Sequence, residues 1–159
     1  MNILAETFTN RWFSATFHWR DGLLTSIDLD AKIKPATSPQ SPHGVKLARI
    51  IAEYAQLEAD IWPELPLDTS RLTPFSMHVL KTLQLHTPRG CRTTYGRLAA
   101  LCGSPRAARA VGGAMARNPW PLLYPCHRVL TGSMGLGGFS CGVALKRTLL
   151  TLEKGALAE

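Results

Sequence analysis

Apolar and polar residues alternate in the first third of the chain in a way that predicts strands followed by a helix. Residues 8–19 and 23–29 are rich in aromatic residues, Thr and Ile, and Asp21-Gly22 between them is a strong hairpin signal. Residues 45–57 carry a broad apolar stripe at helical spacing. We therefore expect a small N-terminal α/β lobe.

Two proline-containing stretches interrupt these patterns. Residues 31–43 hold three prolines and many small polar residues, which predicts a loop. Residues 62–73 combine prolines with a short apolar piece before a new helical pattern begins. We place a domain boundary there, with an N-terminal lobe at residues 1–68 and a C-terminal domain at residues 69–159.

The C-terminal domain begins with predicted helices. Thr73 can cap a helix that has Pro74 at its first position and runs to about His86. Two further helical patterns lie on either side of residues 102–105, where Gly103 can end the first helix, Ser104 can cap the second and Pro105 can open it. This arrangement is the outline of a helix-turn-helix.

The second of these helices, expected over residues 105–117, has an unusual composition. Three arginines stand among alanines and the adjacent glycines Gly112 and Gly113. Each glycine costs a helix about 1 kcal/mol relative to alanine, so another surface is expected to approach closely. Packing against a neighbouring helix, with the arginines at the rim, is the alternative.

Length and cysteine usage limit the class of protein. A chain of 159 residues suits one compact unit or two small lobes, and no apolar run approaches the roughly 18 residues of a membrane span. The N-terminus lacks the pattern of a signal peptide, so we expect a cytoplasmic protein with four reduced cysteines. No CxxC or HxxxH occurs, which disfavours zinc.

Charge is distributed unevenly along the chain. Residues 1–73 carry seven basic and nine acidic side chains, whereas residues 74–159 carry eleven and two, and the whole chain has a net charge of +7. A long basic segment without counter-charges favours a polyanionic partner, for which nucleic acid is the leading candidate. A basic surface that serves only solubility is the alternative.

The stretch YPCHRVL places a thiol and an imidazole next to each other at Cys126 and His127. A thiol becomes a good nucleophile as the thiolate, and a nearby base can remove its proton. Side chains of neighbouring residues on a strand point to opposite faces, so contact between them requires a turn or a bridging water. A buried, inert cysteine is the alternative at this point.

Several motifs in the C-terminal half together resemble one protein family. PCHRV, TPFSMHVLKTL, RTTYGRLAALCGSP, ARAVGGAMARNP and GGFSCGVALKRTLLTLE are similar, in order and spacing, to blocks of the O6-alkylguanine-DNA alkyltransferases. The N-terminal lobe matches only loosely. The resemblance implies direct repair of DNA, in which an alkyl group moves from O6 of guanine, and possibly from O4 of thymine, to the protein's own cysteine in a single turnover.

The resemblance also implies roles for individual residues. Cys126 would accept the alkyl group, while His127, acting through a water, and Glu153 would draw off the thiol proton. Tyr95 would donate a hydrogen bond or a proton to the departing guanine ring, and Asn118 would brace the turn that aims Cys126. Without the resemblance, Glu153 could equally be an exposed residue of a C-terminal helix.

DNA binding and base recognition involve further residues in the same comparison. Arg109 would enter the base stack after the nucleotide rotates out, and the helix rich in small residues would lie in the minor groove. The expected DNA-contacting residues are Tyr95, Gly96, Ser104, Ala107, Ala108, Arg109, Gly112, Arg117, Arg128 and Gly132. The expected base pocket is formed by Val129, Phe139 and Ser140.

The fold class we expect is α/β. The N-terminal α/β lobe would carry a ribonuclease-H-like sheet, and the mainly helical C-terminal lobe would carry a winged-helix-like helix-turn-helix. No cofactor and no metal are expected, and the partner would be double-stranded DNA bound by a monomer with little sequence preference. Phe139 stands where the family often has tyrosine, and Cys141 adds a second thiol close to the site.

Two functions from other classes remain open. A helix-turn-helix regulator or damage sensor would bind DNA equally well after Cys126→Ser and would form no covalent product. A cysteine hydrolase or transferase that acts on a small substrate would turn over repeatedly and would not need the basic helix around Arg109. A regulator would usually read the major groove with larger side chains than those of this helix. The helix around Arg109 therefore distinguishes the alkyltransferase from both alternatives.

Overall fold

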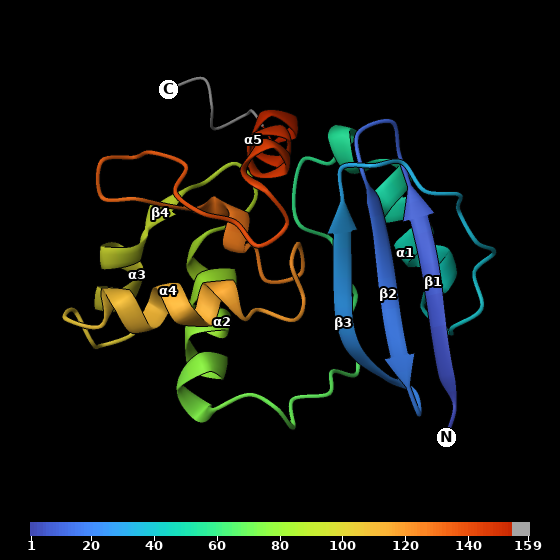
Figure 1. Cartoon of the computed structure of the whole chain (residues 1–159), viewed down its shortest axis with the longest axis horizontal. Coiled ribbons are helices and arrows are strands. Elements are labelled where there is room, and N and C mark those ends of the chain that lie inside the picture. Colours follow the sequence, from blue (N-terminus) through green and yellow to red (C-terminus); the bar gives the residue numbers. More distant parts are fainter. Residues whose placement is uncertain (154–159) are drawn as a thin grey trace. The chain divides into compact units, whose positions relative to one another are not determined.

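A computed structural model describes residues 1–153, and the chain divides into two compact units, Met1–Ser70 and Arg71–Glu159 (Figure 1). Residues 154–159, the end of the expected C-terminal domain, lie outside the described residues. The division falls two residues after the expected boundary. In the described part, no helix is both long enough and apolar enough to cross a membrane.

The first unit is a three-stranded antiparallel sheet with a helix against one face (Figure 1). Its strands β1 (Ile3–Thr9), β2 (Ser14–Arg20) and β3 (Leu23–Asp30) are neighbours in sequence order. The helix α1 (Gly44–Ala52) is followed by the 3-10 turn η1 (Tyr54–Gln56). Alternate side chains of β2 and the apolar stripe of α1 are buried, and they form the core of this unit.

The expected continuous strand over residues 8–19 is wrong. Asn10 breaks it, because its Oδ1 accepts hydrogen bonds from the backbone nitrogens of Trp12 and Phe13 at 2.8 and 3.0 Å, as in an Asx turn. The turn separates β1 from β2, and β1 extends back to Ile3. The hairpin at Asp21-Gly22 is confirmed, since both residues adopt positive φ, at 50° and 82°.

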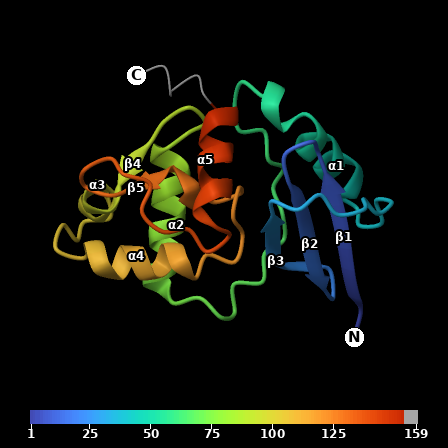
Figure 2. The ribbon, with the colours of Figure 1, turned by 45° about the horizontal axis from the view of Figure 1, so that its top comes forward.

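The second unit is mainly helical (Figure 2). Helices α2 (Pro74–His86), α3 (Tyr95–Leu101) and α4 (Ala108–Ala116) pack on one another. The short strands β4 (Thr93–Thr94) and β5 (Val129–Leu130) pair in parallel, and the 3-10 turn η2 (Cys126–Arg128) leads into β5. The last helix, α5 (Val143–Leu152), packs against η2.

The helix signals of this unit are partly confirmed. The Thr73 side chain accepts a hydrogen bond from the backbone of Ser76 at 3.1 Å, so α2 begins as expected. Gly103 ends α3 at φ 82°. The expected start of the second helix is wrong, because Ala107 N donates to Ser104 O at 2.9 Å, which makes residues 104–107 a turn. Helix α4 therefore begins at Ala108.

Candidate active site

The pairing of β4 with β5 brings Tyr95 near Cys126, although the two residues are far apart in the sequence. Thr93 lies opposite Val129 in this parallel pair, so the start of α3 lies beside the end of η2. The Thr94 side chain accepts a hydrogen bond from Arg97 N at 3.1 Å and caps α3. Tyr95 is thereby fixed as the first residue of a short, capped helix.

Asn118 holds the loop that precedes Cys126. Its Nδ2 donates to Tyr124 O at 2.9 Å, and its Oδ1 accepts from Trp120 N at 3.0 Å. Leu122, in the same loop, has φ 76°, a region that favours glycine, while its side chain is buried. The loop is thus held in a sparsely populated conformation by its packing and by the Asn118 amide.

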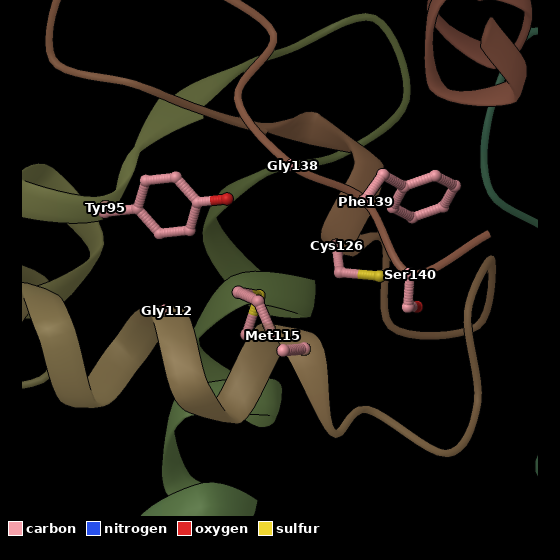
Figure 3. Close-up of a pocket in the computed structure, with 8 residues that line it drawn as sticks. Tyr95, Gly112, Met115, Cys126, Gly138, Phe139 and Ser140 are labelled. Atoms are coloured by element: carbon pink, nitrogen blue, oxygen red, sulfur yellow. The ribbon is translucent and has the colours of Figure 1, made fainter. Parts of the chain in front are cut away.

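The Cys126 side chain lies in a pocket of about 220 Å³. Figure 3 shows Cys126 between Tyr95 and Ser140, with Met115 of α4 on another wall. The Tyr95 hydroxyl is directed inward. The pocket is lined by Tyr95, Gly112, Met115, Ala116, Cys126, Gly138, Phe139 and Ser140. Elements far apart in sequence therefore form one pocket with a single nucleophile in its wall.

Burial governs the protonation of the two titratable side chains in this pocket, Cys126 and Tyr95. Burial raises the pKa of the Cys126 thiol to about 11, although a hydrogen bond from the Asn118 side chain and the charge of Lys146 act in the opposite direction. Burial likewise raises the pKa of Tyr95, and the negative charge of an ionised Cys126 raises it further. At neutral pH the resting site therefore holds a thiol and a phenol, and the thiol requires a base to become a nucleophile.

His127 is the imidazole closest in sequence to that thiol, and it is fully buried. Its Nε2 lies 2.8 Å from Oε2 of Glu153, which is also buried. The other ring nitrogen, Nδ1, is buried and has no hydrogen-bond partner among the described protein atoms. A carboxylate therefore orients the ring at one nitrogen and leaves the other available for a proton from the thiol through a water.

Glu153 remains ionised because of its neighbours. Burial alone would raise its pKa, but His127 and Arg128 outweigh burial and hold that pKa well below the usual range. The Nε of Arg128 donates to Glu153 Oε1 at 2.9 Å, and its Nη1 donates to Thr87 O at 2.9 Å. The alternative of an exposed helical residue is wrong, since Glu153 is 5% exposed.

Arg128 differs from its expected role in DNA contact. Its side chain is 1% exposed, and its guanidinium is bonded inside the unit to Glu153 and Thr87. A buried guanidinium with these partners cannot reach a phosphate without breaking them, so we remove Arg128 from the expected DNA-contacting residues. Its place beside His127 in the sequence gave no sign of this inward orientation.

Most of the other expected DNA-contacting residues lie on α3, on α4 with its C-cap Arg117, and in the turn between the helices, whereas Gly132 follows β5. Arg109 and Arg117 are exposed, and no acidic group in the described part forms an ion pair with either of them. Gly96 and Gly132 are also exposed, whereas Ser104, Ala107, Ala108 and Gly112 are half-buried. Apart from Gly132, the small residues and the arginines thus belong to the helix pair α3 and α4 of the second unit.

The two glycines of α4 are not required by packing inside this unit. A Cβ on Gly112 would meet only the Tyr95 ring, at 3.9 Å, which is ordinary contact. A Cβ on Gly113 would meet the mobile end of the Arg117 side chain at 3.1 Å. Tight packing against a neighbouring helix therefore does not explain the glycines, and access from outside the unit remains as their explanation.

Four residues of the site were missed at the sequence level. Met115, Ala116 and Gly138 line the pocket, and the fully buried Lys146 of α5 donates a hydrogen bond to Gly138 O. Lys146 had a usable signal, because it falls on the same helical stripe as Leu145, Leu149 and Leu150. A charged residue in an apolar stripe indicates a specific partner.

Known proteins resemble this chain in sequence and in structure. Residues 74–155 match the family described as 6-O-methylguanine DNA methyltransferase, DNA binding domain. A methylated-DNA--protein-cysteine methyltransferase of Methanothermobacter thermautotrophicus is 36% identical over 141 residues, which are 85% of this chain and 76% of that protein. The crystal structure of Mycobacterium tuberculosis O6-methylguanine methyltransferase has a TM-score of 0.76 at 31% identity and covers 98% of this chain and 94% of the other.

Other relatives match over the C-terminal half alone. The human methylated-DNA--protein-cysteine methyltransferase is 49% identical over 79 residues, which are 50% of this chain and 38% of that protein. The match with the protein of the same name from Thermococcus gammatolerans spans 49% of that relative. The aligned part thus spans about half or less of these two relatives. A structure of the M. tuberculosis protein in complex with DNA has a TM-score of 0.74 at 32% identity and covers 96% of this chain and 93% of the other.

Proposed function

Because this chain belongs to the O6-methylguanine DNA methyltransferase family, we propose that it repairs DNA directly by transferring an alkyl group from O6 of guanine to Cys126. The observation that carries the proposal is the placement of one thiol in a pocket beside a phenol, with a buried imidazole and carboxylate behind it. Such an arrangement suits a nucleophile that ionises during the reaction.

The transfer is a displacement at the alkyl carbon. Cys126 Sγ attacks this carbon, the bond from carbon to O6 breaks, and its electron pair returns to the guanine ring. The thiol proton passes through a water to Nδ1 of His127, and the ionised Glu153 stabilises the imidazolium at Nε2. Tyr95 gives the guanine ring the proton that the ring needs as it departs. One proton leaves sulfur and one reaches guanine, so the reaction consumes no cofactor.

Each molecule reacts once under this proposal. The product at Cys126 is a thioether, whose carbon-sulfur bond is stable in water, and no second nucleophile takes part in the displacement. The protein is therefore a stoichiometric reagent, and the damaged bases that it repairs cannot outnumber its molecules.

DNA reaches the pocket through α3 and α4. The modified oxygen is inaccessible inside a duplex, so the nucleotide must rotate out, at a cost of a few kcal/mol. The exposed Arg109 is suited to fill the gap that remains, and the small residues of α4 fit a minor groove about 6 Å wide. Arginines that contact phosphates bind without sequence preference, as a repair protein requires. All of these residues belong to one chain, so the proposed reaction requires only a monomer.

Two finer features of the expected fold belong to the same proposal. The strand order β1-β2-β3 with a helix on one face supports a ribonuclease-H-like sheet. The α3-turn-α4 arrangement, with the β4–β5 pair next to it, supports a winged-helix-like helix-turn-helix. Activity on O4-alkylthymine would use the same displacement chemistry.

Mass spectrometry tests the proposal. The protein is incubated with a duplex that contains one O6-methylguanine, and its intact mass and its peptides are measured. We expect one added methyl group on Cys126, saturating at one equivalent, and none in Cys126→Ser. A bound duplex without an adduct would indicate a damage sensor, and repeated turnover would indicate a hydrolase.

A further inference from the structure

Arg89 is a cation beside His127 and Glu153 to which the proposed reaction gives no role so far. It lies between α2 and β4, in a turn in which Cys91 N donates to Pro88 O at 2.9 Å and Gly90 has φ 89°. A type II turn favours glycine at this third position, so the local sequence supports the turn. The Arg89 side chain is 4% exposed, and its charge therefore acts inside the second unit.

The guanidinium of Arg89 meets the end of helix α5 at two points. Its Nη2 donates to Leu152 O at 3.3 Å, and its Nη1 lies 4.0 Å from Glu153 Oε2. The last carbonyl groups of a helix have no partner within the helix and carry partial negative charge, so an arginine is favourable there. Glu153 directly follows α5. Arg89 therefore holds the helix end from which the carboxylate reaches His127.

One oxygen of the Glu153 carboxylate lies close to three basic side chains. Oε2 is 2.8 Å from His127 Nε2, 3.1 Å from Arg128 Nη2 and 4.0 Å from Arg89 Nη1. Charges interact more strongly at such separations inside a protein than they do in water. A proton on His127 would add a positive charge next to both guanidinium groups, so each guanidinium opposes the protonation that the carboxylate favours.

The protonation of His127 at rest matters for the proposed reaction. The ring must be neutral to take the proton of Cys126, and a buried carboxylate at 2.8 Å favours the imidazolium form. Arg128 opposes this form, but it donates to both carboxylate oxygens, at 2.9 and 3.1 Å, and its loss would break the carboxylate site. Arg89 lies farther from the carboxylate, so its charge can act on the ring without being part of that hydrogen-bonded pair.

We propose that Arg89 is a positioning residue for proton transfer, which holds the end of α5 that carries Glu153 and whose charge keeps His127 neutral until the substrate is bound. The proposal rests on the proposed function, since it assigns a role within the same site. Arg89 acts through Leu152 O and through its charge, and the proton of the thiol passes only to His127.

Other titratable groups act on the same site and must be kept constant in any test. Besides Arg89, they include Tyr95, Cys126, Arg128, Cys141, Lys146 and Glu153. A purely structural Arg89 would influence stability and the rate of transfer at every pH, but it would leave unchanged the pH at which His127 takes up its proton. The titration of the imidazole ring distinguishes the two roles.

The test compares the full-length wild type with Arg89→Met, Arg89→Gln and Arg89→Lys. The His127 ring is titrated by NMR, with its signals identified by their loss in His127→Gln, and the rate of benzyl transfer from the free base O6-benzylguanine is measured over the same pH range. Arg147→Met is the matched control, because Arg147 is an exposed residue of α5 and its loss changes the net charge equally.

We expect His127 to take up its proton at a pH about one unit higher in Arg89→Met and in Arg89→Gln, because a nearby positive charge has been removed. At acidic pH, benzyl transfer by these two variants should therefore be about tenfold slower than by the wild type. The rates should converge as the pH rises, since His127 is then neutral in every variant. Arg89→Lys keeps the charge and should titrate like the wild type, as should Arg147→Met.

A folded Arg89→Met or Arg89→Gln in which His127 titrates as in the wild type would overturn the proposal. An equal shift in Arg89→Lys would also overturn it, because the ring would then depend on the shape of the side chain and not on its charge. If Arg89→Met does not fold, Arg89→Gln decides, since its amide retains an N–H donor for Leu152 O. Failure of the wild type to accept the benzyl group would contradict the proposed function, whereas the NMR titration would still measure the effect of Arg89 on His127. The two failures are therefore distinguishable.

Discussion

At the residue scale, the site combines a thiol that is protonated at neutral pH with a buried imidazole whose carboxylate partner is ionised at that pH. Burial raises the pKa of the Cys126 thiol to about 11, so the thiol is protonated at neutral pH. The Glu153 carboxylate, ionised at neutral pH, accepts from His127 and stabilises its cationic form. Under the proposed function, the thiol therefore has to lose its proton to the imidazole when the alkylated base is bound.

Glu153→Gln should weaken both stability and reaction. The change leaves the buried Arg128 without its counter-charge, so we expect the free energy of unfolding at pH 7 to fall by about 3 kcal/mol. The pKa of Glu153 is lower in the folded protein than its ordinary value of 4.5, so the unfolded chain binds the proton more readily. This contribution is complete above about pH 4.5 and is lost as the pH falls below it.

Urea unfolding between pH 7 and pH 3 measures this difference. The gap between the wild type and Glu153→Gln should narrow below about pH 4.5, and a gap that stays constant would contradict the pKa shift. Glu53→Gln is the control, because Glu53 forms an exposed pair with Arg49 on α1 and should change stability by less than about 1 kcal/mol.

Tyr95→Phe should slow transfer while the duplex remains bound. Burial keeps the phenol protonated, so the hydroxyl can act as a donor, and the ring that forms the pocket wall is retained in the variant. A positioned general acid commonly contributes a factor of 100 or more, and we expect roughly a 100-fold lower rate of transfer in single-turnover experiments. Duplex affinity measured with Cys126→Ser in both backgrounds serves as the control. An unchanged rate would remove Tyr95 from the chemistry.

The sequence brought the candidate site residues together better than it predicted the buried side chains around them. Cys126, His127 and Glu153 were proposed together on the family resemblance, and the structure places His127 Nε2 2.8 Å from Glu153 Oε2. Arg128 and Lys146 were missed as buried partners, because a basic side chain in a basic segment is most simply expected at the surface. Only the tertiary fold, which brings Thr87, Val129 and Gly138 to them, shows their orientation.

At the element scale, helix α4 contains two adjacent glycines, which lower its helical propensity but keep the surface beside the pocket free of side chains. Gly112 lines the pocket, and neither Gly112 nor Gly113 is held by neighbours that exclude a methyl group. The helix begins at Ala108 instead of Pro105, because the backbone of Ser104 accepts from Ala107 and so closes a turn first. The local residue preferences are compatible with a helix that begins at Pro105 and with one that begins at Ala108. The sequence could therefore predict the helix but not its first residue.

Gly112→Ala should stabilise the protein and slow its reaction. Alanine favours a helix over glycine by roughly 0.5–1 kcal/mol, and the new methyl group would meet only the Tyr95 ring at ordinary contact distance. The same methyl group enters the pocket, so we expect several-fold slower benzyl transfer from O6-benzylguanine. Gly113→Ala is the matched control, since its methyl group faces Arg117 and not the pocket. Equal rates in both variants would show that Gly112 does not limit the pocket.

At the scale of the whole molecule, the two parts of the chain differ in net charge. Nine of the eleven acidic residues lie within residues 1–73, and eleven of the eighteen basic residues lie within residues 74–159. This asymmetry was readable from the sequence, and so was the division into two units, because composition changes where the chain passes from one to the other. The position of Arg109 on an exposed part of α4, in the same unit as the pocket, required the structure.

Arg109→Ala should affect duplex substrates far more than free bases. If α4 faces DNA as proposed, the exposed Arg109 can stabilise an extruded nucleotide; because Arg109 does not line the pocket, reaction with a free base should not depend on it. We expect repair of an O6-methylguanine duplex to fall by at least about tenfold, the equivalent of 1.4 kcal/mol out of the few kcal/mol that extrusion costs. Benzyl transfer from O6-benzylguanine should remain within about twofold of the wild type, a factor worth less than half a kcal/mol.

Salt provides the control for this experiment, since contacts with phosphates release counter-ions and weaken as ionic strength rises. Wild-type duplex binding should fall by at least about tenfold between roughly 50 and 200 mM salt, whereas benzyl transfer from the free base should change little. If Arg109 acts by filling the base stack, its loss lowers duplex repair at every salt concentration and leaves the salt dependence nearly unchanged. Equal losses on duplex and free base would instead place Arg109 among the residues that maintain the pocket.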